Sequence, residues 1–252
     1  MLGKRLLASL LTALLLTTAA TATGGEPVPK EEAPPEAEVA QAVSAQEDQS
    51  WKTLLVNSWN PLPEDFSVEL VPLKNGLKVD KRIYEDLNAM LTDCRKTGLQ
   101  PIVCSAYRPI STQTRLYNNK VARLRSAGYG LEAAKTEAAR WVAVPGTSEH
   151  HTGMALDIVS ISYQLLNEQQ EHTPEQQWLM EHSWEYGFIL RYPQDKCDIT
   201  GIGYEPWHYR YVGREIAADI HERGVCLEEY LNPPPTTSET TEEAADAASS
   251  LL

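Results

Sequence analysis

Two stretches with almost no large apolar side chains confine the folded part of this 252-residue chain. Residues 24–50 are mostly Pro, Glu, Ala and Gln, and residues 233–252 are rich in Thr, Glu, Ala and Ser. Such segments bury too little apolar surface to offset the entropy of ordering, so we predict a disordered acidic linker and a disordered acidic tail. Residues 51–232 remain, a length suited to one domain with its own core.

Residues 1–23 have the parts of a secretory signal peptide. Lys4 and Arg5 give a positive start, residues 6–16 are almost wholly apolar, and residues 20–22 form a small-x-small cleavage site. The alternative is an uncleaved membrane anchor. The apolar run is shorter than the roughly 20 residues that span a bilayer, so we predict cleavage, an extracytoplasmic domain and no stable membrane span.

The distribution of charge argues against a nucleic-acid partner. The net charge is −13, and most of it lies in the linker and the tail. The domain has no basic stripe of the kind that binds phosphate backbones, so we predict no nucleic-acid partner. The acidic flanks leave open a scaffold that binds a partner through charge, although such runs are usually solvated linkers.

The apolar pattern predicts a mixture of helices and short strands. Helices are expected at 81–97, 111–126, 131–142, 174–186 and 214–224. Strands are expected at 54–57, 67–72, 100–105, 154–160, 188–192 and 207–212. Because strands and helices do not alternate regularly, we predict a single α+β domain with a mainly antiparallel sheet flanked by helices.

The pattern of the four cysteines does not decide whether two of them form a disulfide. No C-x-x-C motif occurs, which excludes a cysteine zinc site of that type. Cys94 falls late in a predicted helix, and Cys104 falls at the end of the next predicted strand. An exported protein can hold a disulfide there, but the two residues are equally compatible with small buried thiols.

Two short stretches contain the residues that indicate chemistry. The first is S-E-H-H-T-G-M-A-L-D at 148–157, and the second is E-P-W-H-Y-R-Y-V-G at 205–213. His150, Asp157 and His208 offer two imidazoles and one carboxylate, the usual protein ligands of a catalytic zinc site. From spacing alone, a metal site and ordinary hydrogen-bonding histidines both remain open.

Glu205 lies three residues before His208. Pro206 keeps Glu205 out of helical geometry, so this is no H-E-x-x-H motif and Glu205 should lie in a loop near His208. A carboxylate there is suited to accept a proton from a metal-activated water.

These motifs resemble a known family. The patterns S-x-H-x-x-G-x-A-x-D and E-x-W-H-x-R-Y-V-G, with S-x-Y-R at 105–108 and N-P-L-P at 60–63, are similar to those of VanY-type D-alanyl-D-alanine carboxypeptidases. Related D-Ala-D-Ala dipeptidases and L,D-carboxypeptidases share them. The resemblance covers nearly all of residues 54–231 and implies the zinc D-Ala-D-Ala peptidase (hedgehog-like) fold.

The resemblance also assigns roles by position. The zinc ligands of the family fall on His150, Asp157 and His208, and its general base falls on Glu205. Zinc is the implied cofactor, although this ligand set tolerates other divalent metals.

The arginine of the S-x-Y-R motif falls on Arg108, to which the resemblance gives substrate binding and oxyanion stabilisation. A fixed guanidinium can neutralise charge on a scissile carbonyl or fork onto a carboxylate. Ser148 is a weaker candidate for substrate binding. Pro109 stands where relatives often have serine.

The implied activity is removal of the terminal D-alanine from peptidoglycan stem peptides by an exported, cell-wall-associated, monomeric enzyme. The alternatives are an L,D-carboxypeptidase acting on tetrapeptide stems, a D,D-dipeptidase acting on free D-Ala-D-Ala, and a non-catalytic wall-binding module that retains zinc. The motifs do not separate the three peptidase specificities, and an intact Glu205 argues against the binding module.

Neighbouring residues receive structural interpretations. His151 is expected beside the metal site at the cleft rim, and Gly153 is expected to allow the tight turn between the ligands. Trp207 is expected to pack beneath the ligand strand. Arg210 shares a face with His208, which fits either a partner of the metal ligands or an ordinary ion pair. The remaining histidines, at 172, 182 and 221, are expected to be solvated.

Overall fold

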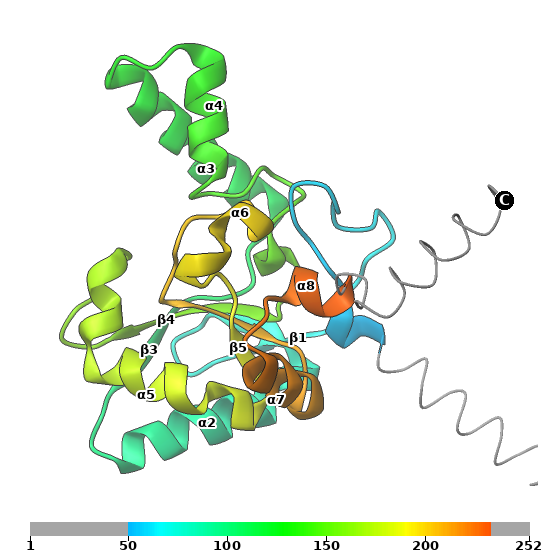
Figure 1. Cartoon of the computed structure of the whole chain (residues 1–252), viewed down its shortest axis with the longest axis vertical. Coiled ribbons are helices and arrows are strands. Elements are labelled where there is room, and N and C mark those ends of the chain that lie inside the picture. Colours follow the sequence, from blue (N-terminus) through cyan, green and yellow to red (C-terminus); the bar gives the residue numbers. More distant parts are fainter. Residues whose placement is uncertain (1–49, 233–252) are drawn as a thin grey trace, which may run out of the picture. The chain divides into compact units, whose positions relative to one another are not determined.

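The computed structural model describes residues 50–232, and a four-stranded antiparallel sheet lies at their centre (Figure 1). The strand order is β3-β4-β6-β5. The strands are β3 (Pro101–Ser105), β4 (Ala155–Ser160), β5 (Phe188–Leu190) and β6 (His208–Tyr211). A separate hairpin pairs β1 (Leu70–Pro72) with β2 (Lys78–Asp80). Within the described part of the chain every paired strand is antiparallel, so the predicted α+β class is confirmed.

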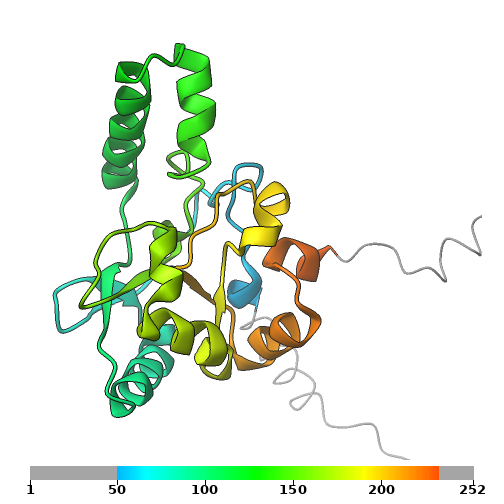
Figure 2. The ribbon, with the colours of Figure 1, turned by 60° about the vertical axis from the view of Figure 1, so that its left-hand side comes forward.

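Helices α2 (Tyr84–Lys96) and α5 (Pro174–His182) cover one face of this sheet (Figures 1 and 2). Helix α7 (Arg214–Arg223) lies beside β5, where its Ala217 and Ile220 pack with Ile189 in a second, smaller core cluster. A 3-10 turn, η2 (Lys81–Ile83), precedes α2, and the Asp80 side chain caps this turn by accepting the Arg82 backbone N–H at 2.8 Å. Apolar side chains of α2 and α5 pack with the sheet to form the main core; examples are Leu87, Met90, Leu91, Ile158, Leu179 and Phe188.

Two further helices form a hairpin that extends from the opposite side of the sheet (Figure 2). They are α3 (Ile110–Ser126) and α4 (Leu131–Ala139). In α3 only Gln113 is buried, and in α4 only Ala134 and Ala138 are. The hairpin therefore adds little to the core, and one face of α3 is available to line a cleft.

Short helices complete the domain. They are η1 (Ser50–Thr53), η3 (Glu149–Thr152), η4 (Glu168–His172), η5 (Ser183–Tyr186), η6 (Gln194–Lys196), α6 (Cys197–Thr200) and α8 (Leu227–Leu231). The predicted helix at 174–186 is thus α5 followed by the 3-10 helix η5. None of the helices within residues 50–232 is long and apolar enough to cross a membrane.

The predicted strand at 54–57 is wrong. This segment forms one isolated bridge, between Asn57 and Asn60. The carbonyl of Leu54 accepts a hydrogen bond from Arg210 Nη2 at 2.8 Å. A buried side chain therefore satisfies a backbone group that a strand neighbour would otherwise satisfy.

All four cysteines are free thiols, so the suggested Cys94–Cys104 disulfide is not formed. Cys94 is buried in the core. Cys104 lies at an irregularity in the pairing of β3 with β4 and is exposed. Since successive strand side chains point to opposite faces, Val103 faces the core and Cys104 does not. The predicted signal peptide, linker and tail lie outside the described residues.

Candidate functional site

Strand register brings three residues from distant parts of the chain into one row. Ser105 of β3 lies opposite Asp157 of β4, which lies opposite His208 of β6. Directly opposed residues of antiparallel strands hold their Cβ atoms roughly 4.5–5.5 Å apart. The sheet itself therefore fixes the separation of Asp157 and His208.

A tight turn before β4 adds His150 to this row. His150 lies in η3, and Gly153 ends η3 in the left-handed conformation at φ 75°. A Cβ at Gly153 would lie 2.8 Å from the backbone nitrogen of Asp80, closer than real Cβ contacts allow. Glycine is thus required for the tight turn, as expected from the sequence, and also for the close approach of the Asp80 backbone.

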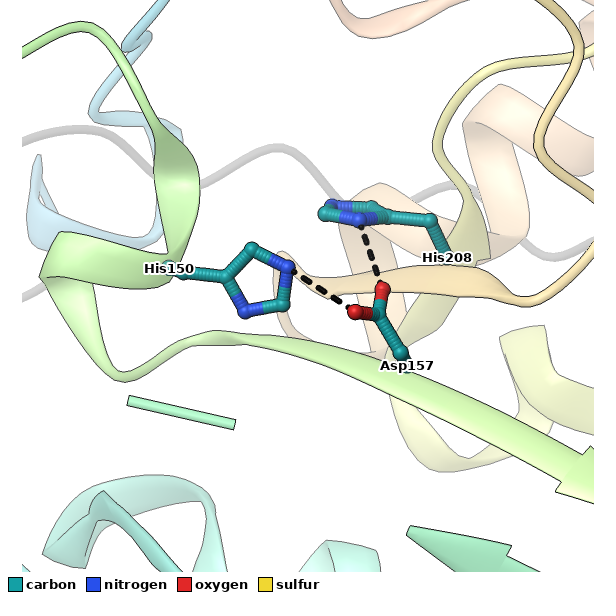
Figure 3. A group of neighbouring side chains, drawn as sticks. All are labelled: His150, Asp157 and His208. Carbon is teal, nitrogen blue, oxygen red and sulfur yellow. Dashed lines mark hydrogen bonds and ion pairs between the residues drawn. The ribbon is translucent and has the colours of Figure 1, made fainter. Parts of the chain in front are cut away.

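His150, Asp157 and His208 form a buried cluster in which the carboxylate faces both imidazoles (Figure 3). His150 Nε2 is 3.4 Å from Asp157 Oδ2, and His208 Nδ1 is 3.1 Å from Asp157 Oδ1. One ligand atom from each residue lies within 4.8 Å of the others. Ligands at zinc-bond lengths around a tetrahedral ion would be about 3.4 Å apart, so the cluster fits a zinc ion.

The hydrogen bonds outside the cluster support this fit. His150 Nδ1–H donates to the carbonyl of Ala106 at 2.8 Å, which leaves the lone pair of Nε2 facing the cluster. His208 Nε2 is buried and has no hydrogen-bond partner within residues 50–232, but the Glu149 Oε2 atom lies 3.6 Å away. An Nε2–H directed at Glu149 would leave the Nδ1 lone pair for a metal.

Glu205 lies beside the cluster in a loop before β6. Its Oε2 atom is 3.7 Å from His208 Nδ1, and its side chain is buried. Burial raises the pKa of Glu205 to about 8, the nearby His208 charge acts to lower it, and Asp157 acts to raise it. A carboxyl group with this pKa is suited to exchange protons near neutral pH.

Arg108 reaches the cluster from the segment after β3. Its Nη1 donates to Gln113 Oε1 at 2.7 Å, and its Nη2 donates to Ser105 Oγ at 2.8 Å and lies 3.5 Å from Asp157 Oδ2. These contacts fix the guanidinium at the cleft while leaving it part-exposed. A cation held in this way can meet a substrate carboxylate or a developing oxyanion.

His151 has a different position from the one expected. It is buried rather than at the cleft rim. Its Nδ1–H donates to the carbonyl of Arg108 at 2.6 Å, and its Nε2 accepts the backbone N–H of Gly146 at 3.2 Å. His151 therefore ties the Arg108 segment to the turn before η3 and lies outside the metal-binding group.

No sequence motif indicated a role for Glu149 or Arg191. Glu149 Oε1 accepts Arg191 Nε and Arg210 Nη1, each at 2.8 Å, and Arg191 also forms a two-pronged pair with Glu228 of α8. Burial acts to raise the pKa of Glu149, but both arginines hold it well below its usual range. Arg210 is thus an ion-pair partner whose acid adjoins a cluster histidine.

The cluster lies in a cleft with a volume of about 1170 Å³. Arg108, Ser148, Glu205 and Trp207 all line it, although the Ser148 side chain makes no hydrogen bond with the described residues. Helix α3 forms one wall. The structure therefore gathers all six predicted site residues around one cavity; these are Arg108, Ser148, His150, Asp157, Glu205 and His208.

Residues 76–214 match the profile of the VanY family, described as D-alanyl-D-alanine carboxypeptidase. This chain belongs to the VanY family. A D-alanyl-D-alanine carboxypeptidase from Enterococcus faecalis is 44% identical over 231 residues, which are 92% of this chain and 84% of that protein. The family resemblance in the motifs is confirmed, and with it the prediction that the chain is an enzyme.

Two solved VanY-type structures agree with this assignment. VanYB in complex with D-alanine-D-alanine is 45% identical, with a TM-score of 0.68 over 73% of this chain and 99% of that one. A VanY D,D-pentapeptidase variant from a VanB-type resistance cassette, in complex with Zn(II), is 46% identical, with a TM-score of 0.67 over 72% of this chain and 99% of that one. The part of this chain that matches therefore corresponds to nearly the whole of both solved chains.

Proposed function

We propose that this chain is an extracytoplasmic zinc D,D-carboxypeptidase that removes the terminal D-alanine from peptidoglycan stem peptides. The observation that carries the proposal is the buried His150, Asp157 and His208 cluster, with Glu205 and Arg108 in the same cleft. The VanY relatives named above act on or bind D-Ala-D-Ala compounds, and one holds Zn(II). Zinc is accordingly the cofactor.

His150 Nε2, an Asp157 oxygen and His208 Nδ1 would hold the metal. Bound there, zinc supplies Lewis-acid chemistry, which polarises a scissile carbonyl and makes a water more acidic. The chain's own residues do the rest. Glu205 accepts the proton of the attacking water and passes it to the amine of the departing D-alanine. Arg108 neutralises the negative charge that develops on the carbonyl oxygen.

Glu205→Gln tests the proposed general base. The change keeps the shape of the side chain but removes its ability to accept a proton, so kcat should fall by roughly 10²–10⁴-fold. Zinc content and thermal stability should stay near wild type. Glu132→Gln, at an exposed position of α4, removes the same charge away from the cleft and should leave kcat unchanged. Undiminished turnover in Glu205→Gln would show that another group takes the proton.

The location at the cell wall and the monomeric state are part of the same proposal. Support for export comes from the signal-peptide pattern of residues 1–23. Cell fractionation of the native organism tests it, since enzyme found only in the cytoplasm would contradict export. Gel filtration with light scattering tests the monomer.

A further inference from the structure

One wall of the cleft is a single face of helix α3. Gln113, Leu116, Lys120 and Arg123 all line the cleft, and their spacing of three, four and three residues puts them in one stripe along the helix. Gln113 holds Arg108 at the metal end of this stripe. The cationic side chains of Lys120 and Arg123 lie at the other end of the stripe.

The length of this stripe matches that of a short extended peptide. Gln113 and Lys120 are seven residues apart, which is about 10 Å along a helix. An extended peptide covers about 3.3 Å per residue. A substrate whose terminal residue lies at Arg108 and whose chain follows α3 would therefore bring its residue about three positions upstream to Lys120.

Lys120 and Arg123 have no carboxylate within 4.0 Å among residues 50–232, so neither forms an ion pair there. Lys120 Nζ lies over the Trp141 ring, 5.5 Å from its centroid. Glu137 is nearby, but its Oε1 atom accepts the Trp141 indole N–H at 2.9 Å. Among the described residues, Lys120 and Arg123 are thus two adjacent cations of the cleft without a partner of opposite charge.

The surroundings of Lys120 disfavour its charge in the absence of an anion. Burial is the largest effect that lowers its pKa, the neighbouring charge of Arg123 acts in the same direction, and Glu137 and Glu205 oppose them. A bound anion would offset both the desolvation and the mutual repulsion of the two cations.

We propose that Lys120 and Arg123 form a carboxylate-binding subsite that recognises an acidic residue upstream of the scissile bond. The inference rests on the proposed carboxypeptidase function and specifies which stem peptides that function prefers. A stem peptide can supply such a carboxylate from a γ-linked glutamate at its second residue or from a diamino diacid at its third. Either residue would present a carboxylate to Lys120 and Arg123, but the carboxylate is attached at a different position along the peptide.

Matched pentapeptides ending in D-Ala-D-Ala test the subsite with the zinc-loaded protein. One pair differs only in a carboxylate or a carboxamide at the second residue, and another pair differs only in a carboxylate at the third. We expect one of the carboxylate peptides to have a KM about tenfold lower than its neutral partner, corresponding to two part-exposed ion pairs. The kcat values should be similar, since this contact is remote from the bond that is cleaved.

The double variant Lys120→Met with Arg123→Gln should remove this preference and keep wild-type turnover of the neutral peptides. Arg115→Gln, which removes a cation from α3 away from the cleft-lining stripe, should retain the preference. The preference should also shrink as salt is raised. Equal KM values within each pair for the wild type, or a preference that survives in the double variant, would overturn the subsite.

Failure of the subsite can be told apart from failure of the carboxypeptidase activity. Turnover of every peptide without charge preference would overturn the subsite alone. If no peptide is cleaved, Kd values of the same peptides for zinc-loaded Glu205→Gln protein decide the matter without turnover. Tenfold tighter binding of a carboxylate peptide would support the subsite, and equal Kd values would overturn it.

Discussion

Glu149 Oε2 lies 3.6 Å from His208 Nε2, and neither atom has a hydrogen-bond partner within residues 50–232. The other oxygen of Glu149 is held by Arg191 and Arg210. The orientation of a cluster histidine thus depends on a buried carboxylate that two arginines fix in place. Carboxylates behind metal-binding histidines commonly set the tautomer and strengthen the ligand.

We expect Glu149→Gln to weaken zinc binding by about 10–100-fold. The amide removes the negative charge that favours an Nε2–H on His208, so the tautomer that leaves Nδ1 free becomes less populated. Competition with a chelator measures zinc affinity, and ¹⁵N NMR of the His208 ring measures the tautomer.

Glu228→Gln is the matched control for this change. It also removes a carboxylate that is paired with Arg191, but Glu228 forms no hydrogen bond or ion pair with His208. Each variant should lose stability by about 3–5 kcal/mol, because a partner of a buried charge is removed. Only Glu149→Gln should change the tautomer. Wild-type zinc affinity and an unchanged His208 spectrum in Glu149→Gln would contradict the role given to Glu149.

Gly153→Ala should destabilise the domain by roughly 2–4 kcal/mol and lower zinc affinity. The cost combines left-handed backbone strain with a Cβ 2.8 Å from the Asp80 nitrogen, and overpacking alone costs about 1–3 kcal/mol. Urea unfolding provides the measurement. Gly128→Ala is the control, since Gly128 has a φ of 98° but open space around its Cβ position. Equal losses in the two variants would contradict the close approach.

All four cysteines should titrate as thiols after unfolding without reductant. In the folded protein at pH 8, Cys94 should react slowly with alkylating agents, because burial raises its pKa to about 11 and little thiolate is present. Cys226 should behave similarly, since burial also raises its pKa to about 11. Mass spectrometry after alkylation counts the thiols. Two thiols instead of four would mean that a disulfide forms.

The chemistry of the candidate site could be read from short motifs because each motif is local. Asp157 and His208 lie on separate predicted strands, and strand periodicity correctly gave the face that His208 shares with Arg210. Their direct opposition depends on the register of β4 with β6, which no local pattern specifies. The sequence alone therefore indicated the residues but not the geometry that joins them.

The buried ion-pair network could not be predicted in this way. Arg191 and Glu228 are 37 residues apart, and each resembles an ordinary surface charge in sequence. The wrong prediction of a strand at 54–57 has a related cause. The apolar residues there have high strand propensity, but Arg210 donates a hydrogen bond to the Leu54 carbonyl that a neighbouring strand would otherwise bind. One signal was available, because an arginine on the ligand face of a buried strand requires a buried acid.

The proposed activity is tested most directly by following the products that zinc-loaded protein forms from a stem pentapeptide ending in D-Ala-D-Ala, with and without a chelator. We expect chelator-sensitive loss of one D-alanine that stops at the tetrapeptide, measured by mass spectrometry. Trimming to the tripeptide would assign L,D-cleavage instead. A folded, zinc-loaded protein that leaves the pentapeptide intact would contradict the carboxypeptidase function and favour a wall-binding module.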